Sequence, residues 1–143
     1  MVHDALVMTH QMLILDARLA RPIPLPLARE IVQDLVRTLL SDLQMQELGA
    51  LEFFPAVDLR APGWSFIQPI TTSHISGHYF DSPASVFIDI YSCQPFDNAT
   101  VVQRVHEALA LGKWVATLVK RDTDPGQRTT EEFSGSGGQI VRP

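Results

Sequence analysis

Two stretches of the chain repeat their apolar residues every three or four positions. The first covers residues 27–43 and the second residues 101–109. This spacing is typical of a helix that packs one face on a hydrophobic core. A proline-rich segment, "RPIPLP", precedes the first stretch and indicates a rigid connector into that helix.

The ends of both helices also have sequence signals. Asp97 or Asn98 is a candidate N-terminal cap for the second helix, because both side chains can accept a hydrogen bond from a free backbone N–H group. Glycine often follows the last helical turn. We therefore expect the first helix to stop at Gly49 and the second at Gly112.

Shorter segments rich in aromatic and β-branched residues occupy most of the remaining chain. They are expected to form strands, at residues 5–16, 50–59, 63–72, 74–80, 84–93 and 113–120. Pro55 and Pro69 fall within two of these segments, so those strands are expected at a sheet edge or with a bulge.

The order strand, helix, several strands, helix, strand predicts the fold class. It indicates an α+β two-layer sandwich, with a mostly antiparallel sheet and two helices on one face. Residues 1–120 are assigned to this single domain. Residues 121–143 are polar, rich in glycine and serine and without periodicity, so they are expected to form a flexible C-terminal tail.

The strands carry apolar residues on both of their faces. In residues 84–93, Val86, Ile88 and Ile90 alternate with Phe87 and Tyr91. Two helices cover only one face of such a sheet, so we expect a second copy of the chain to cover the other face as a homodimer.

Composition narrows the possible function classes. The net charge is -5 with a pI near 5.4, which argues against a nucleic-acid partner. No apolar run reaches the roughly 20 residues of a membrane-spanning helix, and the first residues do not resemble a signal peptide, so a cytoplasmic protein is expected. The single cysteine, Cys93, excludes a disulfide within the chain, and no metal site is expected.

The segment "ITTSHISGHYFDS", residues 70–82, is unusually rich in groups that transfer protons. Alternation along a strand places His74, Ser76 and His78 on one face. The next segment places Asp89 and Cys93 on one face, and the short turn between the segments predicts a hairpin in which these groups converge. The residue types alone leave open a Cys–His hydrolase and purely structural roles.

The motifs "TSHISGH" and "FIDIYSC" resemble the core of the prokaryotic S-adenosylmethionine decarboxylase proenzyme family. The serine, both histidines, the cysteine and the interval between the two motifs match the family pattern. "PGWSF" places Ser65 where the family has a serine that assists processing. The resemblance covers residues 8–120 in the order of their strands and helices.

The resemblance implies a specific chemistry. Ser73 would attack the carbonyl of Thr72, and the chain would cleave itself between these residues so that Ser73 becomes a pyruvoyl cofactor. His78 and Ser65 would assist this processing. The pyruvoyl group would form a Schiff base with S-adenosylmethionine and accept electrons as CO2 leaves, and Cys93 would return a proton. The product would be the aminopropyl donor for spermidine synthesis.

The sequence departs from the family pattern at two places. Thr72 replaces a glutamate, and Asp81-Ser82 replaces Pro-Glu, whose carboxylate grips the ribose of the substrate. Phe80 keeps an aromatic side chain where the family stacks adenine, and Asp81 is a possible substitute for the missing carboxylate. Phe80, Asp81 and Ser82 are therefore the candidate substrate-binding residues.

Three hypotheses stay open at this point. The first is a pyruvoyl-dependent S-adenosylmethionine decarboxylase. The second is a pyruvoyl-dependent decarboxylase of a smaller amino acid, such as ornithine or arginine, which requires an acidic pocket for a distal cation and no aromatic sandwich. The third is an uncleaved, non-catalytic relative that acts as a partner subunit.

Overall fold

The computed structural model describes residues 10–56 and 60–141. Within them the chain forms one eight-stranded sheet in the order β2-β3-β4-β5-β1-β6-β7-β8, and every neighbouring pair is antiparallel. The elements are β1 (His10–Leu19), α2 (Leu25–Asp42), β2 (Glu52–Ala56), β3 (Gly63–Ile70), β4 (Ser73–Asp81), β5 (Ala84–Ser92), α3 (Asn98–Leu109), β6 (Leu111–Arg121), β7 (Arg128–Ser136) and β8 (Gln139–Val141).

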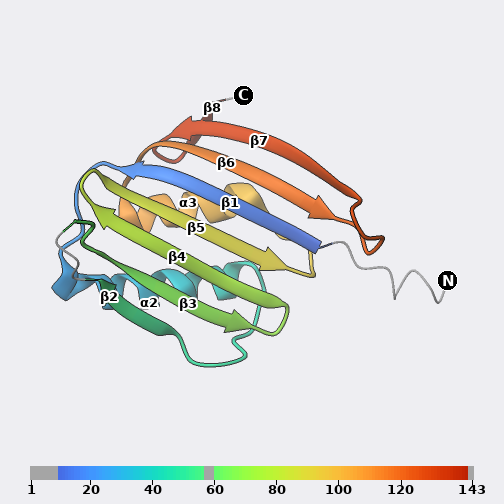
Figure 1. The fold of residues 1–143 in the computed structure, drawn as a ribbon, viewed down its shortest axis with the longest axis horizontal. Coiled ribbons are helices and arrows are strands. Elements are labelled where there is room, and N and C mark those ends of the chain that lie inside the picture. Colours follow the sequence, from blue (N-terminus) through green and yellow to red (C-terminus); the bar gives the residue numbers. More distant parts are fainter. Residues whose placement is uncertain (1–9, 57–59, 142–143) are drawn as a thin grey trace.

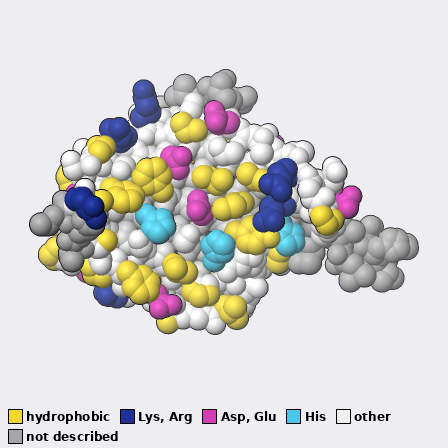
Figure 2. Space-filling view, in the orientation of Figure 1, with side chains coloured by type: hydrophobic (Ala, Val, Ile, Leu, Met, Phe, Trp, Pro, Cys, Tyr) yellow, Lys and Arg dark blue, Asp and Glu magenta, His cyan; other side chains and the backbone are white. Residues whose placement is uncertain are grey.

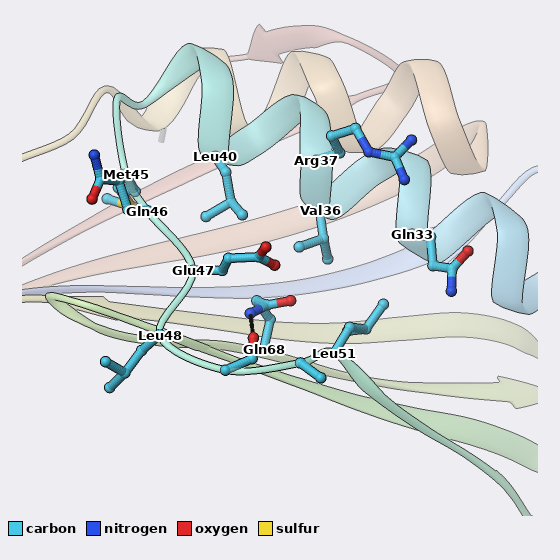
Figure 3. Close-up of a pocket in the computed structure, with 12 residues that line it drawn as sticks. Gln33, Val36, Arg37, Leu40, Met45, Gln46, Glu47, Leu48, Leu51 and Gln68 are labelled. Atoms are coloured by element: carbon cyan, nitrogen blue, oxygen red, sulfur yellow. Dashed lines mark hydrogen bonds between the residues drawn. The ribbon is translucent and has the colours of Figure 1, made fainter.

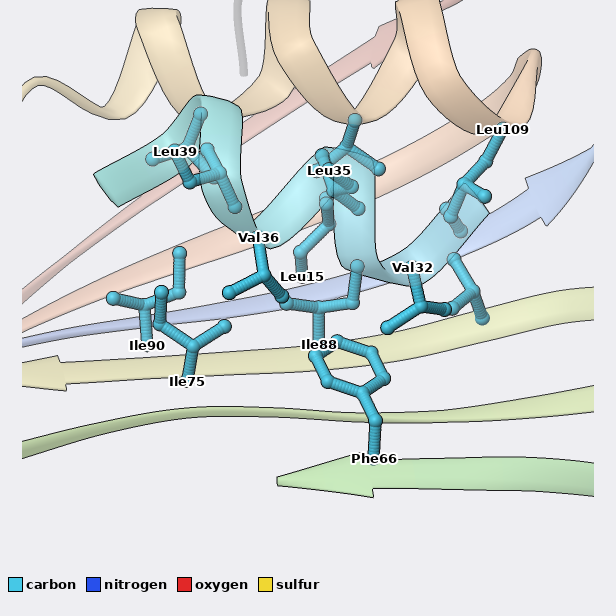
Figure 4. Close-up of a cluster of buried hydrophobic side chains, with 14 of the residues drawn as sticks. Leu15, Val32, Leu35, Val36, Leu39, Phe66, Ile75, Ile88, Ile90 and Leu109 are labelled. Carbon is cyan, nitrogen blue, oxygen red and sulfur yellow. The ribbon is translucent and has the colours of Figure 1, made fainter. Parts of the chain in front are cut away.

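Both helices lie on the same face of the sheet, and the opposite face is open (Figure 1). The apolar stripe of α2 contains Val32, Leu35, Val36 and Leu39, all buried. These side chains and Leu109 of α3 meet the inward-facing side chains of the sheet in one core (Figure 4). The α+β two-layer prediction is therefore confirmed. No helix among the described residues is long and apolar enough to cross a membrane.

The predicted strands agree with the observed ones except at their ends. β1 continues to Leu19, and the expected residues 5–9 lie outside the described part of the chain. Pro55 lies in β2, which is an edge strand. Pro69 lies in β3 beyond the last residue paired with β2, where its carbonyl accepts a hydrogen bond from Leu48 N at 3.0 Å.

The predicted first residues of the helices are closer to the observed ones than the predicted last residues are. Asp97 caps α3, because its Oδ1 accepts a hydrogen bond from Ala99 N at 3.2 Å. The expected stops at Gly49 and Gly112 are wrong, since α2 ends at Asp42 and α3 at Leu109. In both cases a non-glycine residue takes the left-handed conformation that ends the helix: Gln44 with φ 55° and Ala110 with φ 57°.

The expectation of a flexible tail over residues 121–143 is wrong for most of that segment. Residues 128–136 form β7, which pairs over its whole length with residues 113–121 of β6, and residues 139–141 form β8. Trp114 Nε1 donates a hydrogen bond to Gly137 O at 2.9 Å, and Phe133 packs against the core. β7 looks polar because it lies near the sheet edge, where most of its side chains stay exposed while the backbone provides the pairing.

Candidate active site

The turn between β3 and β4 is the centre of the candidate site. Ile70 pairs with Ser73, so only Thr71 and Thr72 connect the two strands. Thr71 N donates a hydrogen bond to Gln46 O at 2.9 Å, which anchors the turn to the segment after α2. The Thr72–Ser73 bond thus lies where a tight hairpin turn enters a sheet strand.

Ser92, the last residue of β5, and the following Cys93 each donate a hydrogen bond to Thr72. Cys93 N donates a hydrogen bond to Thr72 O at 3.0 Å. Ser92 Oγ donates to Thr72 Oγ1 at 3.0 Å and accepts from Gln94 N at 3.0 Å. The structure therefore brings Thr72, Ser73 and Cys93 together, with the backbone of Cys93 in contact with the carbonyl oxygen of the Thr72–Ser73 peptide bond.

The histidines of β4 lie on the open face, as the alternation predicts. Ile75, Gly77 and Tyr79 are buried toward the helices, while His74 and His78 point to the other side. Figure 2 shows this face as a mixture of hydrophobic side chains with histidines among them. The predicted hairpin of β4 and β5 is confirmed, with His74 opposite Tyr91 and His78 opposite Phe87.

Ser65 and His78 form a second group on the same face. They are paired across β3 and β4, and Ser65 Oγ lies 2.7 Å from His78 Nδ1. His78 is five residues from Ser73 along β4, which at the rise of an extended strand corresponds to about 17 Å. Within one chain, Ser65 and His78 therefore lie apart from Ser73 and Cys93, whereas His74 and His78 both interact with Asp89 between the two groups.

Asp89 lies between these two groups. It is half-buried and pairs with Ser76 across β4 and β5. Burial is the main reason why the pKa of its carboxyl is raised, and the nearby Asp16 carboxylate raises it further. His74 and His78 act in the opposite direction on this pKa. A partly buried carboxyl thus occupies the middle of the open face.

The candidate substrate-binding residues divide between the two faces of the sheet. Phe80 and Ser82 line a hollow of about 1170 Å³ on the open face, together with Phe87, Arg18 and Lys113. The rings of Phe80 and Phe87 are 5.8 Å apart and nearly perpendicular, at 71°.

Asp81 does not line this hollow, because the alternation of β4 directs it to the helix side. There it interacts with Tyr79, whose pKa is raised to about 12 by burial and by a hydrogen bond and charge interaction with Asp81, against the opposing hydrogen bond from Ile23 N.

A second hollow, of about 990 Å³, lies between α2 and the segment that precedes β2 (Figure 3). Glu47 and Leu51 line it, and Gln68 is fixed in its floor by hydrogen bonds from Nε2 to Gly49 O and Pro69 O at 2.8 and 2.7 Å. It contains none of the residues that the sequence predicted for the site. Among the described residues, no three His, Cys, Asp or Glu side chains are grouped to hold a metal ion.

Ser92 and the backbone N–H of Cys93 are not among the site residues predicted from the sequence. Ser92 is fully buried, although it directly precedes Cys93 in the motif "IYSC". The available signal was its position, because a serine at the end of a strand opposite a turn can bond to that turn. A backbone donor has no sequence signal at all.

Fold and site define an α+β sandwich in which a serine opens one strand, a cysteine follows the neighbouring strand, and histidines occupy the open face. A family model described as S-adenosylmethionine decarboxylase matches residues 25–122, which is more than half of the chain. The chain belongs to the S-adenosylmethionine decarboxylase family. At the level of this family, its activity is the decarboxylation of S-adenosylmethionine. No curated protein gives a significant match to the chain.

Proposed function

We propose that this protein is a pyruvoyl-dependent S-adenosylmethionine decarboxylase that cleaves its own chain between Thr72 and Ser73 and supplies the aminopropyl donor for spermidine synthesis. The observation that carries this proposal is the hydrogen bond from Cys93 N to the carbonyl oxygen of Thr72. It fixes and polarises the bond that has to react, in a chain whose family membership is known.

Self-cleavage begins with Ser73 Oγ. It bonds to the carbonyl carbon of Thr72, the C–N bond between the residues breaks, and an ester with a free amine results. Negative charge develops on Thr72 O during this step, and the Cys93 N–H group is already in place to stabilise it. Removal of the Cα proton of Ser73 then breaks the ester C–O bond and releases Thr72 as a carboxylate. Water replaces the nitrogen of the resulting dehydro residue, ammonia leaves, and a keto group remains.

The residues around Ser73 fit a pyruvoyl group. It would begin the second fragment at the first position of β4, with the half-buried thiol-bearing Cys93 beside it. The pyruvoyl group supplies an electron sink for the loss of CO2. The role of Cys93 is to hold a proton close to that position and deliver it to the substrate carbon.

The open face supports a homodimer. Five large hydrophobic side chains on this face, which the helices leave uncovered, are between 36% and 49% exposed, and a second copy of the chain could bury them: Phe54, Ile67, Phe80, Phe87 and Val115. Two copies stacked by a twofold axis that crosses β4 near Ser76 would place Ser65 and His78 of one copy over Ser73 of the other. Such a dimer would complete the site, which a single chain leaves in two parts.

The hollow around Phe80 favours S-adenosylmethionine over a smaller amino acid. Phe80 and Phe87 line it and are partly exposed, so the face of a phenyl ring is accessible for stacking with a planar base. Arg18 and Lys113 line it, with Asp16 as the carboxylate among its lining residues, so it does not suit the distal cation of ornithine or arginine.

Two measurements test the proposal. Denaturing mass spectrometry of the purified chain should give two fragments that meet between Thr72 and Ser73, the C-terminal one without a free amino terminus. The processed protein should release CO2 from S-adenosylmethionine in preference to ornithine and arginine. A chain that remains intact at 15.9 kDa would contradict self-cleavage and favour a non-catalytic relative.

A further inference from the structure

Ser92 is a buried hydroxyl with a defined hydrogen-bond network. Its side chain is 0% exposed, and its single proton is directed to Thr72 Oγ1 at 3.0 Å. Its oxygen accepts from Gln94 N, also at 3.0 Å. Because both of its partners belong to chain segments that meet the scissile bond, Ser92 connects the end of β5 to the turn before β4.

The turn needs such a connection. Thr72 is one of only two residues between β3 and β4, and the orientation of its carbonyl depends on the rotation of two peptide planes. A rotation of the plane between Thr72 and Ser73 would remove the carbonyl oxygen from the Cys93 N–H group. Threonine is stiff at χ1, so fixing its Oγ1 also restricts its backbone.

We propose that Ser92 is a positioning residue for self-cleavage. Through the side chain of Thr72 it holds the scissile carbonyl against the N–H group of Cys93 and in a fixed orientation toward Ser73. This inference rests on the proposed function. It also accounts for one departure from the family pattern, because the hydroxyl of Thr72, where a glutamate is expected, has its partner in the hydroxyl of Ser92.

The test is the rate at which freshly made precursor cleaves. Ser92→Ala and Thr72→Val should each slow cleavage by about 10-fold, which corresponds to roughly 1.4 kcal/mol. The double variant should be no slower than either single variant, since both remove the same contact. Ser92→Thr keeps the hydroxyl and should cleave at nearly the wild-type rate. Ser85→Ala is the matched control, since Ser85 is a buried serine on the same strand whose hydroxyl bonds to Pro83 O at 2.9 Å.

A second readout separates positioning from loss of the fold. Hydroxylamine cleaves esters, so it captures the intermediate that forms before elimination. In Ser92→Ala, less ester should be captured per unit time, because the acyl shift is the slowed step. The unfolding temperature of Ser92→Ala should be compared in chains that also carry Ser73→Ala, in which no cleavage interferes.

The outcomes distinguish this inference from the proposed function. If the wild type cleaves and Ser92→Ala cleaves equally fast, or if the two single effects add in the double variant, the positioning role is wrong and the function stands. If the wild type never cleaves, the function and this role both fail. Amide exchange in the Ser73→Ala chain tests the contact itself: unchanged protection of the Cys93 N–H group in Ser92→Ala would show that Ser92 does not hold the carbonyl.

Discussion

Because His78 and Ser73 lie far apart within one chain, we expect each chain to be cleaved with the help of His78 from a second chain. His78 is about 17 Å from Ser73 along β4, far beyond the reach of an imidazole side chain. If His78 moves a proton during processing, it must act on the Ser73 of a second copy. A chain that lacks His78 should therefore be cleaved whenever its partner supplies that histidine.

Two variants isolate this effect. His78→Gln alone should cleave roughly 10²- to 10⁴-fold more slowly than the wild type, which is the usual contribution of a general acid or base. Ser73→Ala alone should not cleave, because it has no nucleophile. In a mixed dimer, the His78→Gln chain keeps its own Ser73 and receives His78 from the Ser73→Ala chain, so it should be cut. With equal amounts and random pairing in twofold dimers, about half of the His78→Gln chains should be cleaved.

The assay requires the two variants to be produced together with tags of different mass. Denaturing mass spectrometry then identifies which chain has been split between Thr72 and Ser73. The control is His78→Gln produced with itself, which should stay almost intact. An uncut His78→Gln chain in dimers shown to be mixed would refute the reasoning, as would His78→Gln that cleaves alone at the wild-type rate.

Four further predictions follow from the same structure. Ser73→Ala should remain intact at 15.9 kDa. The two wild-type fragments should elute together from a sizing column without denaturant, because β1 of the first fragment lies between β5 and β6 of the second. Separation of the fragments under these native conditions would contradict this prediction. Cys93→Ala should still cleave but lose most CO2 release from S-adenosylmethionine, and full turnover would remove the thiol from the mechanism. The pKa of Asp89 is raised in the fold, so the contribution of this carboxyl to the free energy of unfolding is lost as pH rises through that pKa. Asp89→Asn should therefore raise the unfolding temperature at neutral pH and flatten the dependence of that temperature on pH. An unchanged dependence of the unfolding temperature on pH would contradict this prediction. Gly135→Ala would place a Cβ in a clash with the backbone oxygen of Gln139 and with the Trp114 ring, and it should cost about 1–3 kcal/mol in denaturant unfolding, whereas no loss would mean that β7 is not docked as described.

Periodicity predicted the parts of the fold whose side chains are buried on one face. The stripe of α2 and the alternation of β4 were both correct, because burial imposes the period on the sequence. β7 was missed because its exposed side chains have no such constraint, and its pairing with β6 uses backbone groups that every residue has. The helix ends were missed because Gln44 and Ala110 adopt a conformation that glycine takes more often.

The site was predicted in its residue types but not in its geometry. Alternation correctly placed His74 and His78 on one face, yet the same alternation already separates Phe80 from Asp81, so Asp81 could have been excluded from the substrate hollow. The length of β4 could also have shown that His78 is too far from Ser73. The contact between Cys93 N and Thr72 O depends on the register of β4 and β5, which no local pattern specifies.

A cut at the turn between β3 and β4 is compatible with an intact sheet. The bond between Thr72 and Ser73 lies at the end of the turn, so its cleavage leaves in place the pairing of β3 with β4 from Pro69 opposite His74 to Gly63 opposite Phe80. The new end at Thr72 stays anchored through Thr71 N to Gln46 O and through the bridge of Ile70 with Glu47. The new end at Ser73 stays anchored because β4 pairs with β5 over its whole length. The main change is therefore the loss of the covalent connection that closes a very short loop. The two fragments stay associated because β1 of the first fragment lies between β5 and β6 of the second. The proposed self-cleavage between Thr72 and Ser73 would therefore leave the sheet assembled.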